Sequence, residues 1–436
     1  MMRSFHVRKI AIPIGISTLL LLLAAVLVFQ MPGSARAHTA GRIRFVGHAQ
    51  GSNANCASPG YTSIQSAVDA AHAGDTVYLC ASFAEQVIIS KQLTLTGDRG
   101  AAINAPKSFP ASSLALLPPQ FAHDKLFVPE ALVFVWGTHA NVTITNLTIA
   151  GMMPGNNSCA NDEYGVLVLA GAAVTLNNDH VNAIHDSNSS LYGCQFGSAI
   201  QIGRRSWPTA DFAGSVVENF AGHATITNTT VVGYQKDGIV IDGPGSTANI
   251  NWNHVNGSNR DTQFSPTIGQ NGIEILRGAW ASVSHNTILG NTYTGPAYAS
   301  ASGILVFGGC GDPLVKNMEI ADNTLINNDV GIYLNDYSSA PDCSAPATTR
   351  TNNVAANNII RNNAVTNVGY GGQSFPYKGY QTAIDDVGNY DVIINNTISG
   401  AGYVPGRAVV NGPFVLPIDT VSLQTLHPIV HGNHIR

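Results

Sequence analysis

Three charged side chains in two short apolar segments have the residue types and spacing for chemistry on a sugar. Asp242 ends the segment GIVID, and Glu274 and Arg277 lie in the segment GIEILR. If both segments form strands that stack in neighbouring coils, the two carboxylates lie on a diagonal of about 8 Å, from the strand rise and the strand spacing. That separation is within the range for the carboxylate pair of an inverting glycosidase. The sequence therefore predicts Asp242, Glu274 and Arg277 as catalytic residues.

Further side chains are predicted to bind the substrate beside these residues, namely Gln201, Arg204, Lys236 and Tyr333. Arg204, together with Arg277, could hold the carboxylate of an acidic sugar through parallel hydrogen bonds. Tyr333 offers an aromatic surface. An acidic, uronate-type polysaccharide is therefore the expected partner.

Two alternatives to hydrolysis stay open. A calcium-assisted lyase would gather several carboxylates around a hard cation, and Asp237, Asp242 and Glu274 could supply them. The base would then be Arg277 or Lys236. No motif requires a metal or another cofactor, so none is predicted and Ca²⁺ is the one candidate. The other alternative is that these residues are ordinary solvated positions on the outside of a wall.

The segments that carry these residues belong to a repeat. They begin with Gly or Ala and then alternate apolar residues: GVLVLA at 165, AIQIGR at 199, GIVIDG at 238, GIEILR at 272, GILVFG at 303, GIYLND at 331 and AIDDVG at 383. A second strand-like set runs between them, for example ANINWNHV at 248 and ASVSHNTI at 281. Short strands and turns at a spacing of about 30 to 40 residues, with no helical period, predict a solenoid in which each repeat forms one coil.

Alternate side chains of a strand face opposite sides, so the inward positions of the repeat fix the outward ones. One outward column is predicted to contain Leu167, Gln201, Val240, Glu274, Leu305, Tyr333 and Asp385. The next is predicted to contain Leu169, Gly203, Asp242, Leu276, Phe307, Asn335 and Val387. The polar residues of both columns gather in the middle coils.

Asparagines recur two places before an apolar residue, at Asn253, Asn286, Asn323, Asn363, Asn396 and Asn433. In a parallel coil these side chains could stack as a ladder, in which each amide bonds the next and satisfies backbone groups at the turn. We predict a structural role for them.

A short helix is predicted ahead of the first coil. Thr62 and Gln65 have the spacing of a capping box, and Gly74 can close the helix. One helical face would consist of Ile64, Ala67, Val68 and Ala71. Such a helix would cover the open end of the solenoid and protect its strand edges. Residues 75–97, which follow, are predicted to form three short strands.

The composition excludes several classes of protein. Of 436 residues, 44% are hydrophobic and only 11% are charged, so the chain is neither disordered nor strongly polar. A net charge of -5 and a pI near 6.2 give no basic surface of the kind that nucleic-acid binding needs. DNA and RNA are therefore not expected as partners.

Residues 1–37 are predicted to be a secretory signal peptide. The segment contains Arg3, Arg8 and Lys9, an apolar run from Ile10 to Phe29, and small residues at Ala35 and Ala37. A run of about 20 apolar residues can also span a bilayer, so an uncleaved membrane anchor is the alternative. We expect an extracellular monomer, secreted or at the cell surface. Residues 38–55 are predicted to be a linker, and 56–436 one domain with a proline-rich insertion at 105–130.

The order TSIQSAVDAAHAGDTVYL, SFAEQVII and KQLTLTG resembles the opening of right-handed parallel β-helix proteins of the pectin-lyase-like superfamily. The downstream GI-x-I and N-x-I segments are similar to the parallel β-helix repeats of that group. The resemblance covers roughly residues 56–436 without the insertion. It implies an all-β fold, a single right-handed parallel β-helix with a short N-terminal capping helix. It implies no particular reaction, because a shared fold does not transfer function.

The six cysteines are predicted to form three disulfides. Stacking places Cys159 and Cys194 in equivalent turns of adjacent coils, where a strand spacing of about 4.8 Å suits a disulfide. The same argument pairs Cys310 with Cys343, which follow neighbouring strands, and Cys56 with Cys80 would link the N-terminal cap, so the predicted pairs are Cys56–Cys80, Cys159–Cys194 and Cys310–Cys343. An even number of cysteines is typical of an exported chain.

Two functions remain open from the sequence. The first is interaction with an extracellular polysaccharide, as a lyase or hydrolase of uronate-type glycans or as a binding protein. The Gly-His-Gly and Arg-x-Lys motifs of polygalacturonase-like hydrolases do not occur in the chain. The second is a non-catalytic surface or envelope protein that serves adhesion or acts as a spacer. The sequence does not decide whether the protein is an enzyme.

Overall fold

The computed structural model describes residues 41–109, 128–154, 159, 161–205, 219–258, 263–295, 301–308, 312–336, 359–361, 363–366, 381–386, 390–399, 415–419 and 429–436. The predicted signal peptide or anchor, residues 1–37, lies outside these residues. The described residues belong to one compact unit, Gly41–Arg436.

Three long sheets form the unit, and successive strands of the chain go to different sheets. The twelve-stranded sheet contains β1 (Ile43–Val46), β2 (Asp75–Leu79), β5 (Leu93–Gly97), β8 (Asn141–Thr145), β11 (Ala173–Asn177), β16 (His223–Thr227), β19 (Thr247–Asn251), β22 (Trp280–Ser284), β25 (Glu319–Ala321), β28 (Ile359–Arg361), β31 (Val392–Ile394) and β34 (Ile429–His431).

The ten-stranded sheet contains β4 (Val87–Ile89), β7 (Val128–Trp136), β10 (Asn161–Leu169), β13 (Ser198–Ile202), β18 (Asp237–Asp242), β21 (Asn271–Leu276), β24 (Ser302–Gly308), β27 (Val330–Asp336), β30 (Gln381–Asp386) and β33 (Val415–Asp419). The eleven-stranded sheet contains β3 (Phe83–Ala84), β6 (Ala102–Asn104), β9 (Thr148–Ala150), β12 (His180–Asn182), β17 (Thr230–Val232), β20 (His254–Asn256), β23 (Thr287–Leu289), β26 (Thr324–Ile326), β29 (Ala364–Thr366), β32 (Thr397–Ser399) and β35 (His434–Ile435).

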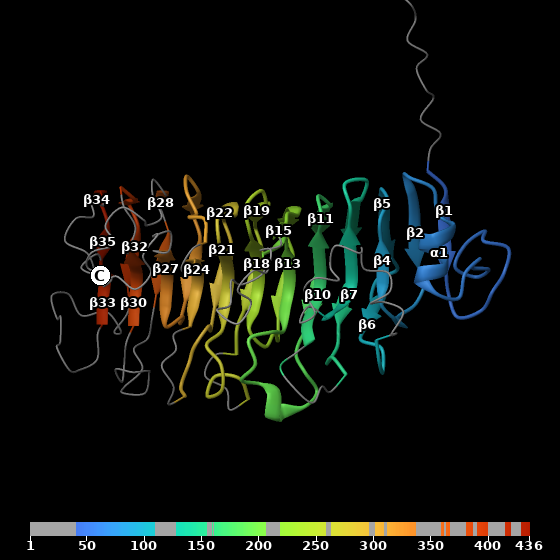
Figure 1. The fold of residues 1–436 in the computed structure, drawn as a ribbon, viewed down its shortest axis with the longest axis horizontal. Helices are drawn as coiled ribbons and strands as arrows, with labels where there is room; N and C mark the ends of the chain where they lie inside the picture. The colour runs from blue at the N-terminus through green and yellow to red at the C-terminus, as the bar shows by residue number, and fades with distance from the viewer. Residues whose placement is uncertain are drawn as a thin grey trace, which may run out of the picture. The chain divides into compact units, whose positions relative to one another are not determined.

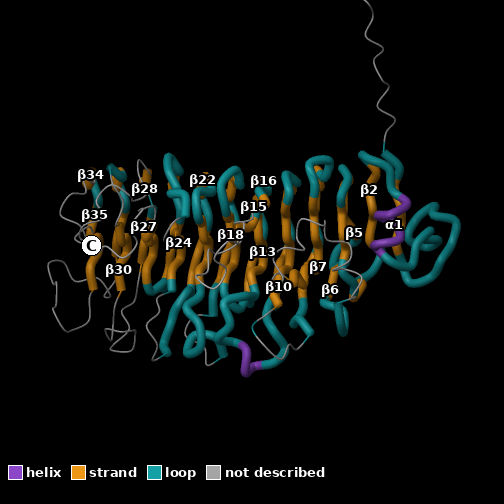
Figure 2. The backbone as a smooth tube through the Cα atoms, in the orientation of Figure 1, coloured by secondary structure: helices purple, strands orange, loops and turns teal. Residues whose placement is uncertain are grey.

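Every strand pairing within these three sheets is parallel, and each coil adds one strand to each sheet. β18, for example, pairs with β13 and with β21, which come from the coils before and after it. Figure 1 shows the strands of successive coils side by side, from β1 to β34, and Figure 2 shows the loops that join them. This arrangement confirms the predicted parallel β-helix.

Alternation of side chains explains why each segment forms a strand with one buried face. In β11, Val174 and Leu176 are buried and the residues between them are only partly covered. Isoleucine, valine and leucine from all three sheets meet in one continuous core along the coils. Fully burying such a side chain contributes roughly 1.5 to 3 kcal/mol, so stacking of coils supplies most of the stability of the unit.

The N-terminal cap differs from the prediction in its details. Helix α1 (Ile64–Ala70) has Ser63 as its N-cap, whose side chain accepts a hydrogen bond from Ser66 N, and its C-cap is Ala71 instead of Gly74. The predicted capping pair Thr62 and Gln65 was therefore wrong by one residue. The expected apolar face is confirmed: Ile64, Ala67, Val68 and Ala71 are buried.

The strands around the cap also correct the prediction. Residues 75–97 form four strands, β2 to β5, because the two-residue β3 adds to the three that were expected. β1 lies within the predicted linker and pairs in parallel with β2. The folded unit therefore begins before residue 56.

The predicted asparagine ladder is confirmed over the whole series. From Asn286 onwards, each asparagine side chain accepts, at Oδ1, hydrogen bonds of 2.9 to 3.0 Å from the backbone N and Nδ2 of the asparagine one coil earlier, whereas Asn253 Oδ1 accepts from Thr229 N at 2.9 Å. Each Nδ2 from Asn253 onwards also donates to a backbone carbonyl of the preceding coil, for example Asn286 to Ile250 O at 2.8 Å. The ladder satisfies buried backbone groups that would otherwise cost free energy.

Two of the three predicted disulfides are present. Cys56 joins Cys80 and Cys159 joins Cys194, each with a Cα–Cα distance of 5.4 Å. The predicted Cys310–Cys343 pair lies outside the described residues. Disulfides of this kind are compatible with an oxidising, extracellular environment. In the described part of the chain, no helix is both long and apolar enough to cross a bilayer.

Candidate functional site

Over the described strands of the ten-stranded sheet, the register confirms the first predicted outward column and four members of the second, whereas the places of Leu169 and Gly203 in the second column stay predictions. Equivalent positions of successive strands are occupied by Leu167, Gln201, Val240, Glu274, Leu305, Tyr333 and Asp385. A second set is formed by Asp242, Leu276, Phe307 and Asn335. The position predicted for Val387 lies outside the described residues.

A third column, which the sequence did not predict, runs along the starts of the same strands. It contains Tyr164, Ser198, Asp237, Asn271, Ser302, Val330 and Thr382. Asp237 was predicted only as a possible calcium ligand. In the structure it lies beside Glu274, at the centre of the candidate site.

The glycine that opens each repeat explains why this column was missed. A Cβ atom on Gly238 would lie 2.5 Å from Gly272 O and 2.8 Å from Val255 Cγ1, which belongs to the core. Gly238 and Ile239 therefore both face inward, and Asp237 faces outward although strict alternation would turn it to the core. The signal in the sequence was the glycine itself, because only a residue without a side chain fits there.

Asp237 and Glu274 form a hydrogen-bonded pair on neighbouring strands. The two residues are 6% and 8% exposed, so water scarcely reaches them. Asp237 also accepts hydrogen bonds from Asn271 Nδ2 at 3.1 Å and from Ser198 Oγ at 3.4 Å. Ionising both carboxyl groups of a pair in contact within a buried site costs free energy, because the two negative charges repel each other and are not hydrated.

Burial and the neighbouring acids determine how this pair is protonated. Burial, the charge of Asp237 and the charge of Asp242 raise the pKa of Glu274 well above its usual range. Burial also raises the pKa of Asp237, but attraction by Lys236 and the hydrogen bonds that Asp237 accepts oppose that rise. Glu274 is therefore the better proton carrier of the two.

The sequence predicted Asp242 as a catalytic carboxylate beside Glu274, but in the structure Asp242 is paired with Arg277. Its two carboxylate oxygens accept hydrogen bonds from Arg277, with Nε at 2.8 Å from Oδ1 and the second contact through Nη2. The side chains are only 1% and 4% exposed. The backbone N of Arg205 donates to Asp242 Oδ2 at 2.9 Å. Two predicted catalytic residues thus form a buried ion pair with each other.

A short antiparallel hairpin, β14 (Arg204–Arg205) and β15 (Asn219–Phe220), lies next to this ion pair. Arg205 Nε contacts Asp312 Oδ1 at 3.0 Å, and the side chain of Asp312 is fully buried. Arg204 Nη2 contacts Asp162 Oδ2 at 3.3 Å. The hairpin is therefore held by acidic residues from three separate coils.

The other predicted binding residues also have partners within the protein. Lys236 Nζ donates to Gly269 O at 2.7 Å, and Gln201 Nε2 donates to Gly203 O at 2.8 Å. Tyr333 is half-buried in the column of Glu274. A substrate carboxylate would therefore compete with an existing partner at each predicted cation that it binds.

Two buried oxygens beside the acid pair have no hydrogen-bond partner among the described residues. They are Asn271 Oδ1 and Ser302 Oγ, in residues that are 2% and 1% exposed. Asn271 and Ser302 are register partners on β21 and β24. Native proteins rarely leave such atoms unsatisfied, so this position suits a hydroxyl group or a water molecule that bonds both.

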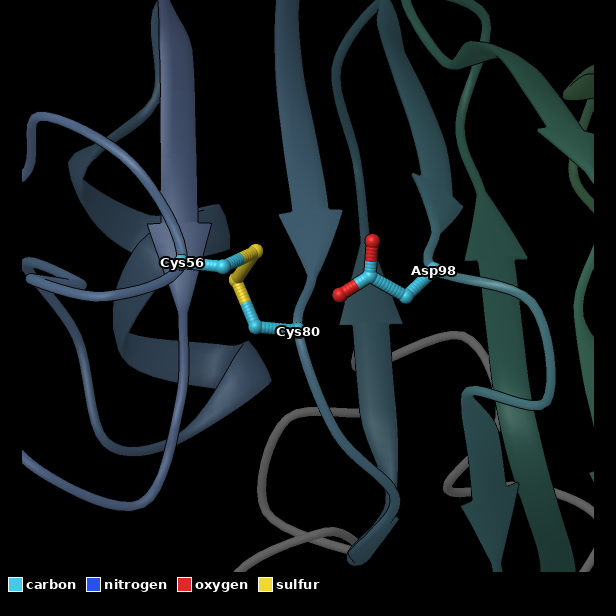
Figure 3. A group of neighbouring side chains, drawn as sticks. All are labelled: Cys56, Cys80 and Asp98. Atoms are coloured by element: carbon cyan, nitrogen blue, oxygen red, sulfur yellow. A yellow bond between two sulfur atoms is a disulfide. The ribbon is translucent and has the colours of Figure 1, made fainter.

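One group of three side chains in the described residues has ligand atoms close enough to share a metal ion. It consists of Cys56, Cys80 and Asp98. Figure 3 shows that the two sulfur atoms of this group are joined in a disulfide, with the Asp98 carboxylate to one side. Because a cysteine binds a metal ion as a thiolate, the two cysteines of this group are not metal ligands while they form the disulfide.

The chain matches no protein-family model and no curated protein. Among solved structures it resembles the lacto-N-biosidase from Eubacterium ramulus, at 12% identity over 91% of this chain and 68% of that one, with a TM-score of 0.48. The Dettilon tailspike protein is 14% identical over 85% of this chain, with a TM-score of 0.47, and the match spans 64% of the tailspike. An alginate lyase from Paenibacillus sp. is 13% identical over 83% of this chain and 95% of that one, with a TM-score of 0.39. Likenesses of this size assign neither a family nor an activity.

Proposed function

We propose that the chain binds a polysaccharide along the outer face of the ten-stranded sheet and cleaves it by acid-assisted hydrolysis, with Glu274 as the proton donor. The observation that carries this proposal is the hydrogen-bonded pair of Glu274 and Asp237. A carboxyl group that stays protonated near neutral pH is what a general acid requires.

The chemistry needs a second carboxylate at a distance, and Asp242 is the candidate. Glu274 gives its proton to the glycosidic oxygen as the bond to the sugar carbon breaks. A water molecule adds its oxygen to that carbon, and its proton passes to Asp242. Strand rise and spacing place the Cα atoms of Asp242 and Glu274 about 8 Å apart on neighbouring strands, and the proposal requires a water molecule between the two carboxyl groups, as in inverting glycosidases. Arg277 holds Asp242 in place through its two hydrogen bonds.

The contacts of the site also bear on the choice of glycan. Asn271 Oδ1 and Ser302 Oγ could bond sugar hydroxyls, which every polysaccharide offers. In this proposal a uronate carboxylate binds the guanidinium of Arg204, either beside Asp162, which contacts Nη2, or in its place. The side chains of Arg204 and Asp162 are 16% and 28% exposed, against 4% and 1% for Arg277 and Asp242, so a substrate reaches Arg204 more easily than Arg277. Arg204, rather than Arg277, is therefore our candidate for recognition of an acidic sugar.

A product assay on pectin, alginate, chondroitin and neutral glycans tests the proposal, with and without Ca²⁺. Hydrolysis produces reducing ends without absorbance at 235 nm, whereas a lyase produces both. We expect Glu274→Gln to lower kcat at least about 100-fold, the usual contribution of a general acid. Arg204→Ala should raise KM for acidic glycans alone. Glu319→Gln, on the twelve-stranded sheet, is the matched control and should retain activity.

A non-catalytic surface protein is the second candidate, and one observation favours it. The Asp242–Arg277 ion pair is almost fully buried, as in structural ion pairs that hold a fold together. A folded protein that leaves every glycan of the panel intact would support this function. Activity that survives Glu274→Gln unchanged would remove Glu274 from the mechanism.

A further inference from the structure

Asp237 reaches Glu274 from the preceding coil. It is the register partner of Asn271, which lies three residues before Glu274 on β21. Both acids are more than nine-tenths buried. In such a contact one carboxyl oxygen must carry a hydrogen, because two ionised groups would repel each other and neither could donate. We therefore expect the pair to hold one proton between its two carboxyl groups while the contact is made.

The surroundings of the two side chains decide where that proton resides. Asp237 faces hydrogen-bond donors, Asn271 Nδ2 at 3.1 Å and Ser198 Oγ at 3.4 Å. Lys236, next to it in the chain, attracts the negative charge of Asp237. These contacts favour the ionised form of Asp237.

Glu274, in contrast, faces a second acid. Asp242 disfavours a negative charge on Glu274, while Lys236 partly offsets this effect. Arg277, three residues after Glu274 in the chain, is hydrogen-bonded to Asp242 and offsets only part of the charge of that group. Tyr234 is the other titratable group near the pair, and it interacts with Asp237. The proton therefore belongs on Glu274.

We propose that Asp237 is a positioning residue: it accepts the hydrogen of Glu274 and keeps Glu274 protonated at neutral pH. The catalytic use of that proton rests on the proposed function, whereas the shared proton itself does not. Once Glu274 gives up its proton, two carboxylates face each other in a buried site. Their repulsion draws a proton back from water and resets the acid.

Infrared spectroscopy of the full chain tests this proposal without any substrate. A protonated carboxyl group has a C=O band that a carboxylate lacks. We expect such a band from Glu274 at pH 7, absent from Glu274→Gln and retained in Glu319→Gln. Asp179, whose pKa burial raises to about 7, adds a second band. All spectra are therefore recorded in an Asp179→Asn background.

Asp237→Asn is the decisive variant, because it removes the charge and keeps the shape. We expect the titration midpoint of the Glu274 band to fall by at least about one pH unit, a tenfold loss of proton affinity. If that variant does not fold, Asn271→Ala replaces it. Asn271→Ala removes the hydrogen bond that Asn271 Nδ2 donates to Asp237, which raises the proton affinity of Asp237. Asp237 then competes with Glu274 for the shared proton, so the Glu274 band should weaken at pH 7.

The possible results separate the two proposals. A wild-type spectrum without the band at pH 7, or a midpoint that Asp237→Asn leaves unchanged, overturns the role of Asp237. The expected band and shift, in a protein that cleaves no glycan, support the shared proton and overturn the proposed function. In an active protein, Asp237→Asn should also move the alkaline limb of the kcat profile to lower pH, whereas a merely structural residue would change kcat at every pH.

Discussion

One residue of the turn that holds the asparagine ladder departs from the pattern. Asp179 is 3% exposed, and its Oδ1 accepts a hydrogen bond from Leu147 N as the ladder asparagines do. Its Oδ2 accepts from Asn177 N at 3.0 Å. Burial nonetheless raises the pKa of Asp179 to about 7. This pKa lies above the pKa that Asp179 has in the unfolded chain, so the folded state binds the proton of Asp179 more tightly than the unfolded state does. The free energy of unfolding therefore falls as the pH rises from about 4 to 7.

Asp179→Asn should therefore stabilise the protein, and more so at high pH. The amide keeps the accepting oxygen and cannot ionise, and its Nδ2 can donate to a carbonyl as in the other ladder residues. From the raised pKa we expect the gain in unfolding free energy to grow by about 2 to 3 kcal/mol between pH 5 and pH 8. Thermal unfolding at the two pH values measures it. The reverse change, Asn253→Asp, should lose stability over the same window, and equal gains at both pH values would contradict the argument.

At the scale of elements, the hairpin β14–β15 depends on an ion pair between distant parts of the chain. Arg205 and Asp312 are 107 residues apart, and the acid is fully buried. Asp312→Asn should cost about 3 to 5 kcal/mol, the usual loss when one partner of a buried pair is removed. Amide exchange should become faster at residues 204–205 and 219–220. In the exposed Arg361–Glu319 pair, at 35% and 40% exposure, the matched change Glu319→Gln should cost less than about 1 kcal/mol.

These elements also show which parts of the fold and of the candidate site could be predicted from the sequence. The two outward columns, the ladder and the described disulfides follow from the repeat alone, because stacking fixes which residues are neighbours. The cap could not be placed to the residue, since Glu85 bonds Ile64 N and Gln65 N from 21 and 20 residues away. The column that contains Asp237 was missed because Gly238 breaks the alternation. The partners of Arg204 and Arg205 were missed because loop contacts carry no period.

At the scale of the whole unit, each coil contacts mainly the coils before and after it. Stability in such a solenoid is approximately a sum over coils and their interfaces. In the asparagine ladder, the number of coils that a residue links therefore depends on its position along the solenoid. Asn323 accepts from Asn286 and donates to Asn363, so it links three coils. Asn433 accepts from Asn396 and donates to Ile393 O, and is itself only half-buried.

Alanine substitution at these two positions should therefore have different effects. Asn323→Ala leaves buried backbone and amide groups unpaired on both sides, each costing roughly 1 to 3 kcal/mol, and should lower the midpoint of global unfolding. Asn433→Ala should leave that midpoint nearly unchanged and speed amide exchange only in residues 393–399 and 429–436. Thermal melts combined with exchange mapped by mass spectrometry compare the two. Equal losses in the midpoint would mean that the coils unfold as one indivisible unit, because in that case the last coil is as essential as a central one.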